Sequence, residues 1–285
     1  MKAHNIILTG VPRGGTTLAC QLLQACRHCV ALFEPMDVAA VPSGDRGAAV
    51  AEVLRFFAAT RAQIAREGVA PSMQVDGAVP DNSFANTLGA DGRRQLVASP
   101  GLIQVDTQGR PDFSLVIKHN AMFTALLPEL GQHFQVLAIV RHPLSVLASW
   151  NSVELPVSEG RLPAGERFDE ELAARLHAQA DRLSRQFLVL DWFFSRFERL
   201  LPALDVLRYE DVVASQGAQL RARAGLDGEP VAGLAERNTN SLYSRSAIPA
   251  LADALGRRDG SWQRWYPAET IAPLAERMLA ANPGT

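Results

Sequence analysis

Residues 5–18 read NIILTGVPRGGTTL, and this stretch decides the fold of the chain. An apolar run typical of a buried strand leads into a glycine-rich turn, and the turn leads into a helix. Gly10 and Gly15 have the spacing of a phosphate-binding P-loop, G-x-x-x-x-G-K-[ST]. Thr16 stands where that loop has the lysine that reaches the β and γ phosphates of a nucleoside triphosphate. The stretch therefore predicts backbone N–H groups at a helix N-terminus that bind a different anion, with Arg13 as the nearby cation.

The rest of the chain continues the alternation of strands and helices. Apolar runs predict strands at 5–11, 30–33, 113–118, 134–140 and 205–209. Helical periodicity predicts helices at 15–27, 47–67, 121–130, 143–153, 168–200, near 211, and at 269–279. This order is typical of an α/β fold, here a P-loop-type three-layer sandwich with a central parallel sheet flanked by helices.

We expect a single domain over residues 1–285, because this length is sufficient for one well-buried core. The stretch 69–112 is rich in Gly, Pro, Asp, Ser and Asn, which predicts a variable segment, mostly loop with weak strands, on the acceptor side of the site. The stretch 154–166 predicts a loop long enough to act as a lid. Between the helix near 211 and residue 269 the chain is polar, and we expect irregular structure there.

Composition excludes several classes of protein. The net charge of -2 gives no field for nonspecific nucleic-acid binding, and no run approaches the roughly 20 apolar residues of a membrane span. Cys20, Cys26 and Cys29 are too few for a disulfide framework and favour a reducing compartment. With no room for a signal peptide before the first strand, a cytoplasmic location is expected. Cys26 and Cys29 have no second pair downstream, so we predict no metal site.

Two motifs together resemble PAPS-dependent sulfotransferases, which use 3′-phosphoadenosine 5′-phosphosulfate (PAPS) as the donor. Residues 12–18, PRGGTTL, resemble the family's 5′-phosphosulfate loop, and residues 136–150, VLAIVRHPLSVLASW, resemble its 3′-phosphate motif. The likeness runs to about residue 265, with poorly matched middle segments. It implies a bacterial-type sulfotransferase that moves a sulfuryl group from PAPS to a hydroxyl or amine of an acceptor. A small-molecule acceptor and no required metal are expected; the oligomeric state is not predicted.

The resemblance also implies which residues bind the donor. Arg141 and Ser149 match the family's pair for the 3′-phosphate, and Tyr209 resembles its tyrosine near the nucleotide. Arg141 and Tyr209 follow predicted strands, at the edge where ligands bind open α/β sheets. The residues implied for the 5′-phosphosulfate are Arg13, Gly14, Gly15, Thr16 and Thr17.

The catalytic candidates are Lys118, Arg13 and one of two bases. Lys118 ends a predicted strand and could neutralise charge on the leaving oxygen, a role that the resemblance supports. Glu34 resembles the catalytic glutamate of protein-tyrosine sulfotransferases and several bacterial relatives. His119 is one residue closer to the lysine than the base of cytosolic sulfotransferases, a shift that would turn its side chain to the other face of a strand. We favour Glu34, which should be partly desolvated because a carboxylate of ordinary pKa is a poor base.

Two other functions fit part of the pattern. A P-loop kinase or NTPase would need a lysine at position 16 and an aspartate at a strand end to organise Mg²⁺. A non-catalytic nucleotide-binding protein would keep the loop and Arg141 without a base or Lys118. The presence of Lys118 and of both candidate bases favours an enzyme.

Overall fold

The computed structural model of the protein describes residues 4–90, 92–107 and 109–282. At its centre lies a five-stranded sheet in the order β2-β5-β1-β6-β7, in which all neighbouring strands are parallel. These strands are β1 (Asn5–Gly10), β2 (Cys29–Phe33), β5 (Ser114–Lys118), β6 (Gln135–Val140) and β7 (Val206–Arg208). The predicted α/β class and central parallel sheet are confirmed.

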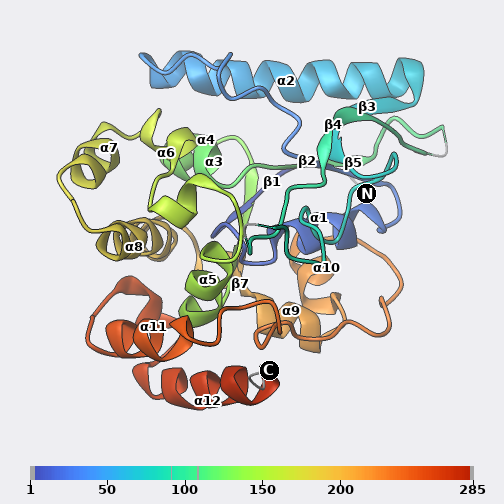
Figure 1. The fold of residues 1–285 in the computed structure, drawn as a ribbon. Coiled ribbons are helices and arrows are strands. Elements are labelled where there is room, and N and C mark those ends of the chain that lie inside the picture. The colour runs from blue at the N-terminus through green and yellow to red at the C-terminus, as the bar shows by residue number, and fades with distance from the viewer. Residues whose placement is uncertain (1–3, 91, 108, 283–285) are drawn as a thin grey trace.

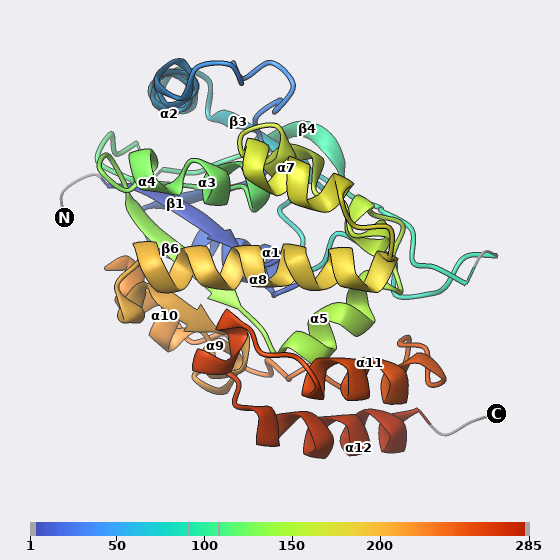
Figure 2. The ribbon, with the colours of Figure 1, turned by 90° about the vertical axis from the view of Figure 1, so that its left-hand side faces the viewer.

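Helices cover both faces of the sheet and complete a three-layer arrangement. In Figures 1 and 2, α1, α9 and α10 lie on one face, and α3 and α8 lie on the other. The helices are α1 (Thr16–Gln24), α2 (Arg46–Glu67), α3 (Ala121–Ala125), α4 (Leu127–Leu130), α5 (Pro143–Trp150), α6 (Pro163–Glu166), α7 (Glu170–His177), α8 (Arg182–Leu200), α9 (Tyr209–Ala214), α10 (Ala218–Ala224), α11 (Ala247–Gly256) and α12 (Ile271–Ala281). Short 3-10 turns are η1 (Pro156–Glu159), η2 (Ala203–Asp205), η3 (Ser261–Arg264) and η4 (Ala268–Thr270).

The core follows from the two-sided burial of the sheet. All five residues of β2 and all five of β5 are buried, as are the last five residues of β1. Strands of this kind read as continuous apolar runs because helices cover both faces. Within the described residues, none of the helices combines the length and apolar character that a bilayer crossing requires.

The predicted helix 168–200 is wrong, because the chain forms two helices there. Asp169 caps α7 by accepting from the N–H of Leu172, and Asp181 caps α8 by accepting from the N–H of Ser184. An aspartate at the N-cap satisfies backbone donors that a helix start leaves unpaired. The second cap therefore starts a new helix at Arg182 within a stretch whose apolar periodicity looked continuous.

The predicted helix 121–130 is also divided, into α3 and α4. Pro128 has no N–H to donate to the carbonyl of Thr124, which accepts instead from Nε of Arg196 at 3.0 Å. The carbonyl of Ala125 accepts from Arg196 and from Arg46, each at 2.8 Å. Two arginines thus replace the helical hydrogen bonds lost at the break.

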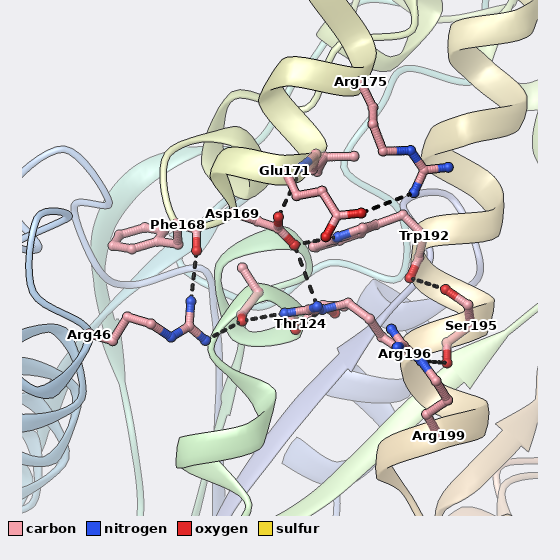
Figure 3. Close-up of polar contacts among 12 residues, drawn as sticks. Arg46, Thr124, Phe168, Asp169, Glu171, Arg175, Trp192, Ser195, Arg196 and Arg199 are labelled. Carbon is pink, nitrogen blue, oxygen red and sulfur yellow. Dashed lines mark hydrogen bonds and ion pairs between the residues drawn. The ribbon is translucent and has the colours of Figure 1, made fainter.

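Figure 3 shows that this break belongs to a larger polar network. Oδ2 of Asp169 lies 3.4 Å from Nη1 of Arg196 and accepts from Nε1 of Trp192 at 2.8 Å. Arg46 also pairs with Glu129 at 2.6 Å. The network joins α2, α3, α7 and α8 across one face of the molecule.

In 69–112, β3 (Val69–Gln74) and β4 (Ser99–Gln104) pair as an antiparallel two-stranded sheet, which confirms the weak strands predicted there. The stretch expected to be irregular contains α10 and α11, so that expectation is wrong. In α11 the buried side chains are Ile248, Leu251 and Leu255, and this helix packs on α5 and α12.

Candidate functional site

Each strand of the central sheet ends next to a candidate residue or loop at the same edge of the sheet. Glu34 follows β2, Lys118 ends β5, the loop 10–15 follows β1, Arg141 follows β6 and Tyr209 follows β7. A cavity of about 910 Å³ lies over this edge, and all of these elements line it. The carboxyl ends of parallel strands meet at one edge, where open α/β sheets bind ligands. The structure therefore brings together candidates from widely separated parts of the sequence.

The loop 10–15 has a backbone shape that depends on glycine. Gly15 has φ of 93°, and a Cβ on this residue would lie 2.5 Å from Cδ2 of Tyr209. Among the described residues no side chain caps α1, which starts directly after Gly15. The first N–H groups of a helix have no partner within the helix. Gly15, Thr16 and Thr17 line the cavity, so these donors are available to an anion there.

Arginine side chains concentrate positive charge beside this loop. Arg13, Arg94 and Arg141 all line the cavity, and Arg94 and Arg141 are 3% and 6% exposed. Burial, then the charge of Arg94, and to a lesser extent that of Arg141, lower the pKa of the Arg13 guanidinium to about 9, while Tyr243 opposes the shift. Within the described residues, neither Arg13 nor Arg141 forms an ion pair with a carboxylate. The three guanidinium groups therefore form a positive site of the kind that an anion stabilises.

Arg141 is held in place on several sides. Its guanidinium lies 4.6 Å from the centroid of the Tyr209 ring, and its Nε donates to Oδ1 of Asn238 at 2.7 Å. Nη1 donates to the carbonyl of Arg13 at 3.2 Å, and Nη2 lies 3.3 Å from the hydroxyl of Tyr243. These contacts fix the guanidinium at the end of β6.

Glu210 fixes the orientation of the Asn238 side chain by accepting hydrogen bonds. Its Oε1 accepts from Nδ2 of Asn238 at 2.8 Å and from the backbone N–H of His142 at 3.1 Å. Its Oε2 accepts from the hydroxyl of Tyr266 at 2.7 Å. Because Asn238 must donate to Glu210, its carbonyl oxygen faces Arg141 as an acceptor. Glu210 and Asn238 are thus positioning residues for the arginine.

Ser149 lies beneath the loop and is not among the described residues that line the cavity. Its side chain is 1% exposed, and its Oγ accepts from Nε of Arg13 at 3.1 Å. Arg13 also donates to Oδ1 of Asn82 at 3.3 Å and lies 4.6 Å from the ring centroid of Phe84. In the structure, Ser149 therefore orients Arg13, while Arg13 itself faces the cavity.

Glu34 and Lys118 form an ion pair at the carboxyl ends of β2 and β5, the strands farthest from β7 in the sheet. Nζ of Lys118 lies 2.6 Å from Oε1 of Glu34; the side chains are 3% and 38% exposed, respectively. Desolvation alone would raise the pKa of the Glu34 carboxyl, but the Lys118 ammonium, then His119, outweigh it and leave the pKa below its ordinary 4.5. The expected desolvation is therefore present, but the pair makes the carboxylate a weaker base than a solvated one.

His119 lines the same cavity as Lys118, contrary to the expected opposite orientation. The strand alternation does not extend to it, because β5 ends at Lys118. Nε2 of His119 accepts from the backbone N–H of Met36 at 3.2 Å, and burial lowers its pKa to about 4. The imidazole is thus neutral near pH 7 and its Nε2 lone pair is engaged in holding the segment after Glu34.

Sequence reasoning missed the site residues that come from irregular segments. Arg94 is held by a bond from its Nε to the carbonyl of Ala85 at 2.8 Å, and Asn82 lies two residues before Phe84. Asn238 and Tyr243 come from the turns before α11. These positions belong to no periodic pattern or motif, and only their three-dimensional placement reveals them.

Within the described part of the chain, no group of three or more His, Cys, Asp or Glu side chains is placed to hold a metal ion. Comparison of the chain with protein-family models and with curated proteins found no match.

Proposed function

We propose that the protein is a sulfotransferase that transfers the sulfuryl group of PAPS to a hydroxyl or amine of a small-molecule acceptor. The observation that carries the proposal is that Arg13, Arg94 and Arg141 line one cavity beside the loop 10–15, with Arg94 and Arg141 buried. Desolvation and the charges of the other two arginines lower the pKa of Arg13 to about 9, which agrees with a site for an anion. A ligand with separate anionic groups, one at the loop 10–15 and one at the end of β6, balances these charges. PAPS has such groups, and the two sequence motifs resemble the loops that bind them.

Residues of the chain can perform each part of the transfer. PAPS, when bound, supplies an activated sulfuryl group. Glu34 accepts the proton of the acceptor hydroxyl as the acceptor oxygen forms its bond to sulfur. Lys118 stabilises the phosphate oxygen that keeps the electron pair of the broken S–O bond, and the departing product is 3′-phosphoadenosine 5′-phosphate (PAP). Arg13 and the N–H groups at the start of α1 stabilise the same phosphate.

The Glu34–Lys118 pair links donor binding to the strength of the base. Lys118 is the largest influence that lowers the pKa of Glu34. When Lys118 donates instead to the phosphate of a bound donor, desolvation raises the pKa of Glu34. The carboxylate thus becomes a better base only once the donor is present.

Two other functions are alternatives for this site, and the test is chosen to separate them from a sulfotransferase. A kinase or NTPase lacks support at two positions, since Thr16 replaces the phosphate-binding lysine and Arg141 follows β6 where an Mg²⁺-organising aspartate would be needed. A non-catalytic nucleotide-binding protein does not account for the Glu34–Lys118 pair. For location we propose the cytoplasm, because the thiols of Cys20, Cys26 and Cys29 are buried and unpaired.

Calorimetric titration of PAP and of ATP, each with and without Mg²⁺, tests the proposal on wild type and Arg141→Met. We expect metal-independent binding of PAP that weakens at least about a hundredfold in the variant, since a charged hydrogen-bonded pair contributes about 1.5–3 kcal/mol or more when buried. Arg257→Met is the matched control, because this arginine is exposed and, among the described residues, pairs with Asp253 one turn earlier in α11. Preference for ATP with Mg²⁺, or equal PAP binding by Arg141→Met, would refute the proposal.

A further inference from the structure

The cavity has a charged part and an apolar part. The arginine cluster and the loop 10–15 make up the charged part, described above. Three other segments contribute apolar side chains: the chain after β2, the β3–β4 region, and residues 155–164, which include η1 and the start of α6. Prominent among these side chains are Met36, Met73, Leu96, Leu155, Val157 and Leu162. At about 910 Å³ the cavity is close to the upper end of the roughly 300–1,000 Å³ typical of small-molecule sites, so it has room beyond a nucleotide.

The cations of the apolar part are already paired. Lys118 pairs with Glu34, and Nε of Arg161 lies 3.1 Å from each carboxylate oxygen of Glu166. Among the described lining residues, the remaining cations belong to the arginine cluster and to Arg237, which pairs with Asp81 at 3.3 Å. An acceptor with a carboxylate or sulfate of its own would therefore be desolvated without a counter-charge.

Exposed apolar side chains are concentrated in one segment of the chain, residues 88–102. Seven large hydrophobic side chains are exposed in the described part of the chain, and four of them lie within residues 88–102. These are Leu88, Leu96, Val97 and Leu102, which are 46–58% exposed. Leu96 also lines the cavity, so this exposed apolar side chain lies at the apolar part of the site. Exposed apolar side chains at the rim of a cavity favour an apolar ligand there.

We infer that the acceptor is a hydroxyl compound with an uncharged, apolar body. Its hydroxyl reaches Glu34, and its body lies against the side chains of Met36, Met73 and Leu96. This inference rests on the proposed function, because it names the acceptor of the same transfer. The lining disfavours acidic peptides, which need free cations, and it offers apolar side chains to the body of the acceptor.

A pair of probes that differ by one carboxylate tests the inference. The fluorescence of 2-naphthol and of 6-hydroxy-2-naphthoate is titrated with the protein in the presence of saturating PAP, whose own binding is measured separately. We expect 2-naphthol to bind at least about tenfold more tightly than the naphthoate, because burying the unpaired charge is unfavourable. Leu96→Asp should weaken 2-naphthol binding about tenfold, and PAP binding by this variant is measured separately. Leu204→Asp is the control, since Leu204 lies in η2 and is 71% exposed.

The possible results separate the two proposals. PAP binding with equal or tighter binding of the naphthoate, or with 2-naphthol binding that Leu96→Asp does not alter, overturns the apolar acceptor and leaves the sulfotransferase standing. Binding of glucose or of an acidic tyrosine peptide in preference to 2-naphthol also overturns the apolar acceptor and leaves the proposed sulfotransferase function standing. Failure of PAP to bind overturns the proposed function, and the inference about its acceptor with it.

Discussion

Nζ of Lys118 lies 2.6 Å from Oε1 of Glu34, so the end of β5 is tied to the first residue after β2. The two residues are 84 positions apart in sequence but adjacent in space, because β2 and β5 are neighbours in the sheet. Glu34 also has φ of 43°, a left-handed conformation that non-glycine residues adopt rarely. Strained residues of this kind persist where the surroundings hold them, and they concentrate at functional sites.

Glu34→Gln should lower the free energy of unfolding by about 1 kcal/mol at pH 7, because it leaves the buried Lys118 ammonium without its opposite charge. The pKa of Glu34 is lowered in the folded state, so the stabilisation by the pair is complete above the ordinary pKa of 4.5. It is lost as the pH falls through the lower folded-state pKa. Urea unfolding of both proteins should therefore show a difference at pH 7 that is smaller at pH 3.

Glu171→Gln is the control for this measurement, because Glu171 is 83% exposed and lies 4.0 Å from Arg175. Surface pairs contribute little, so its difference from wild type should be small at both pH values. A Glu34→Gln difference that is independent of pH would show that the carboxylate is not the titrating group.

PAP binding should weaken at high pH because Arg13 loses its proton. Burial, Arg94 and Arg141 lower the pKa of free Arg13 to about 9, and a bound phosphate raises it again. Binding is then coupled to proton uptake above pH 9, so the dissociation constant should rise about tenfold per pH unit there and stay flat between pH 7 and 8. Calorimetry in buffers of different ionisation enthalpy measures both the affinity and the proton uptake.

Arg13→Gln serves as the comparison for this pH dependence. The variant should bind PAP more weakly at pH 7 and show no further loss between pH 9 and 10. A similar loss of affinity in wild type and variant would assign the titration to another group.

Gly15→Ala should disrupt the loop. The added Cβ would lie 2.5 Å from the ring of Tyr209, and φ of 93° is unfavourable for alanine. Either the ring or the loop must move, and both bear on the proposed phosphate site, so we expect PAP binding to fall at least about tenfold. Gly256→Ala is the matched control, since a Cβ there has nothing within 4 Å. Unchanged PAP binding by Gly15→Ala would show that the loop does not contact the ligand.

Arg196→Met should destabilise the fold without a direct effect on the site. The change removes the side-chain donor to the carbonyl of Thr124, one of the two arginine donors to the carbonyl of Ala125, and the ion pair with Asp169 (Figure 3). A buried acceptor left unpaired costs about 1–3 kcal/mol, so the melting temperature should fall by several degrees. Arg199→Met is the control on the same helix, because Arg199 donates only to Ser195 within α8 among the contacts drawn in Figure 3. Equal melting temperatures for the two variants would contradict the role assigned to Arg196.

Local patterns were sufficient to predict the central fold. β1 and β6 read as apolar runs because helices bury both faces, and α1 follows a glycine turn with a recognisable spacing. The helix 168–200 was predicted as one element because apolar periodicity continues through it, while the caps that divide it are single side chains. α11 was missed because the polar residues around it conceal a short buried stripe.

The site was predictable where a motif or a strand end placed the residue. Glu34, Lys118, Arg141 and Tyr209 all lie at the edge that parallel strands share, and the structure places them around one cavity. The lowered pKa of Glu34 was not predictable, because it results from a contact across 84 positions of sequence. Arg94 could not be found in advance, since its place depends on how an irregular segment folds back onto the loop.

The order β2-β5-β1-β6-β7 also sets the distance between candidate residues at the carboxyl edge of the sheet. Neighbouring strands lie about 4.8 Å apart, so the four steps from the end of β2 to the end of β7 cover about 19 Å. Glu34 and Tyr209 stand at the two ends of that row. For the proposed transfer, two substrates lie end to end along it. An inhibitor that joins an acceptor to PAP should therefore have its linkage over the carboxyl ends of β5 and β1, near Lys118 and the loop 10–15.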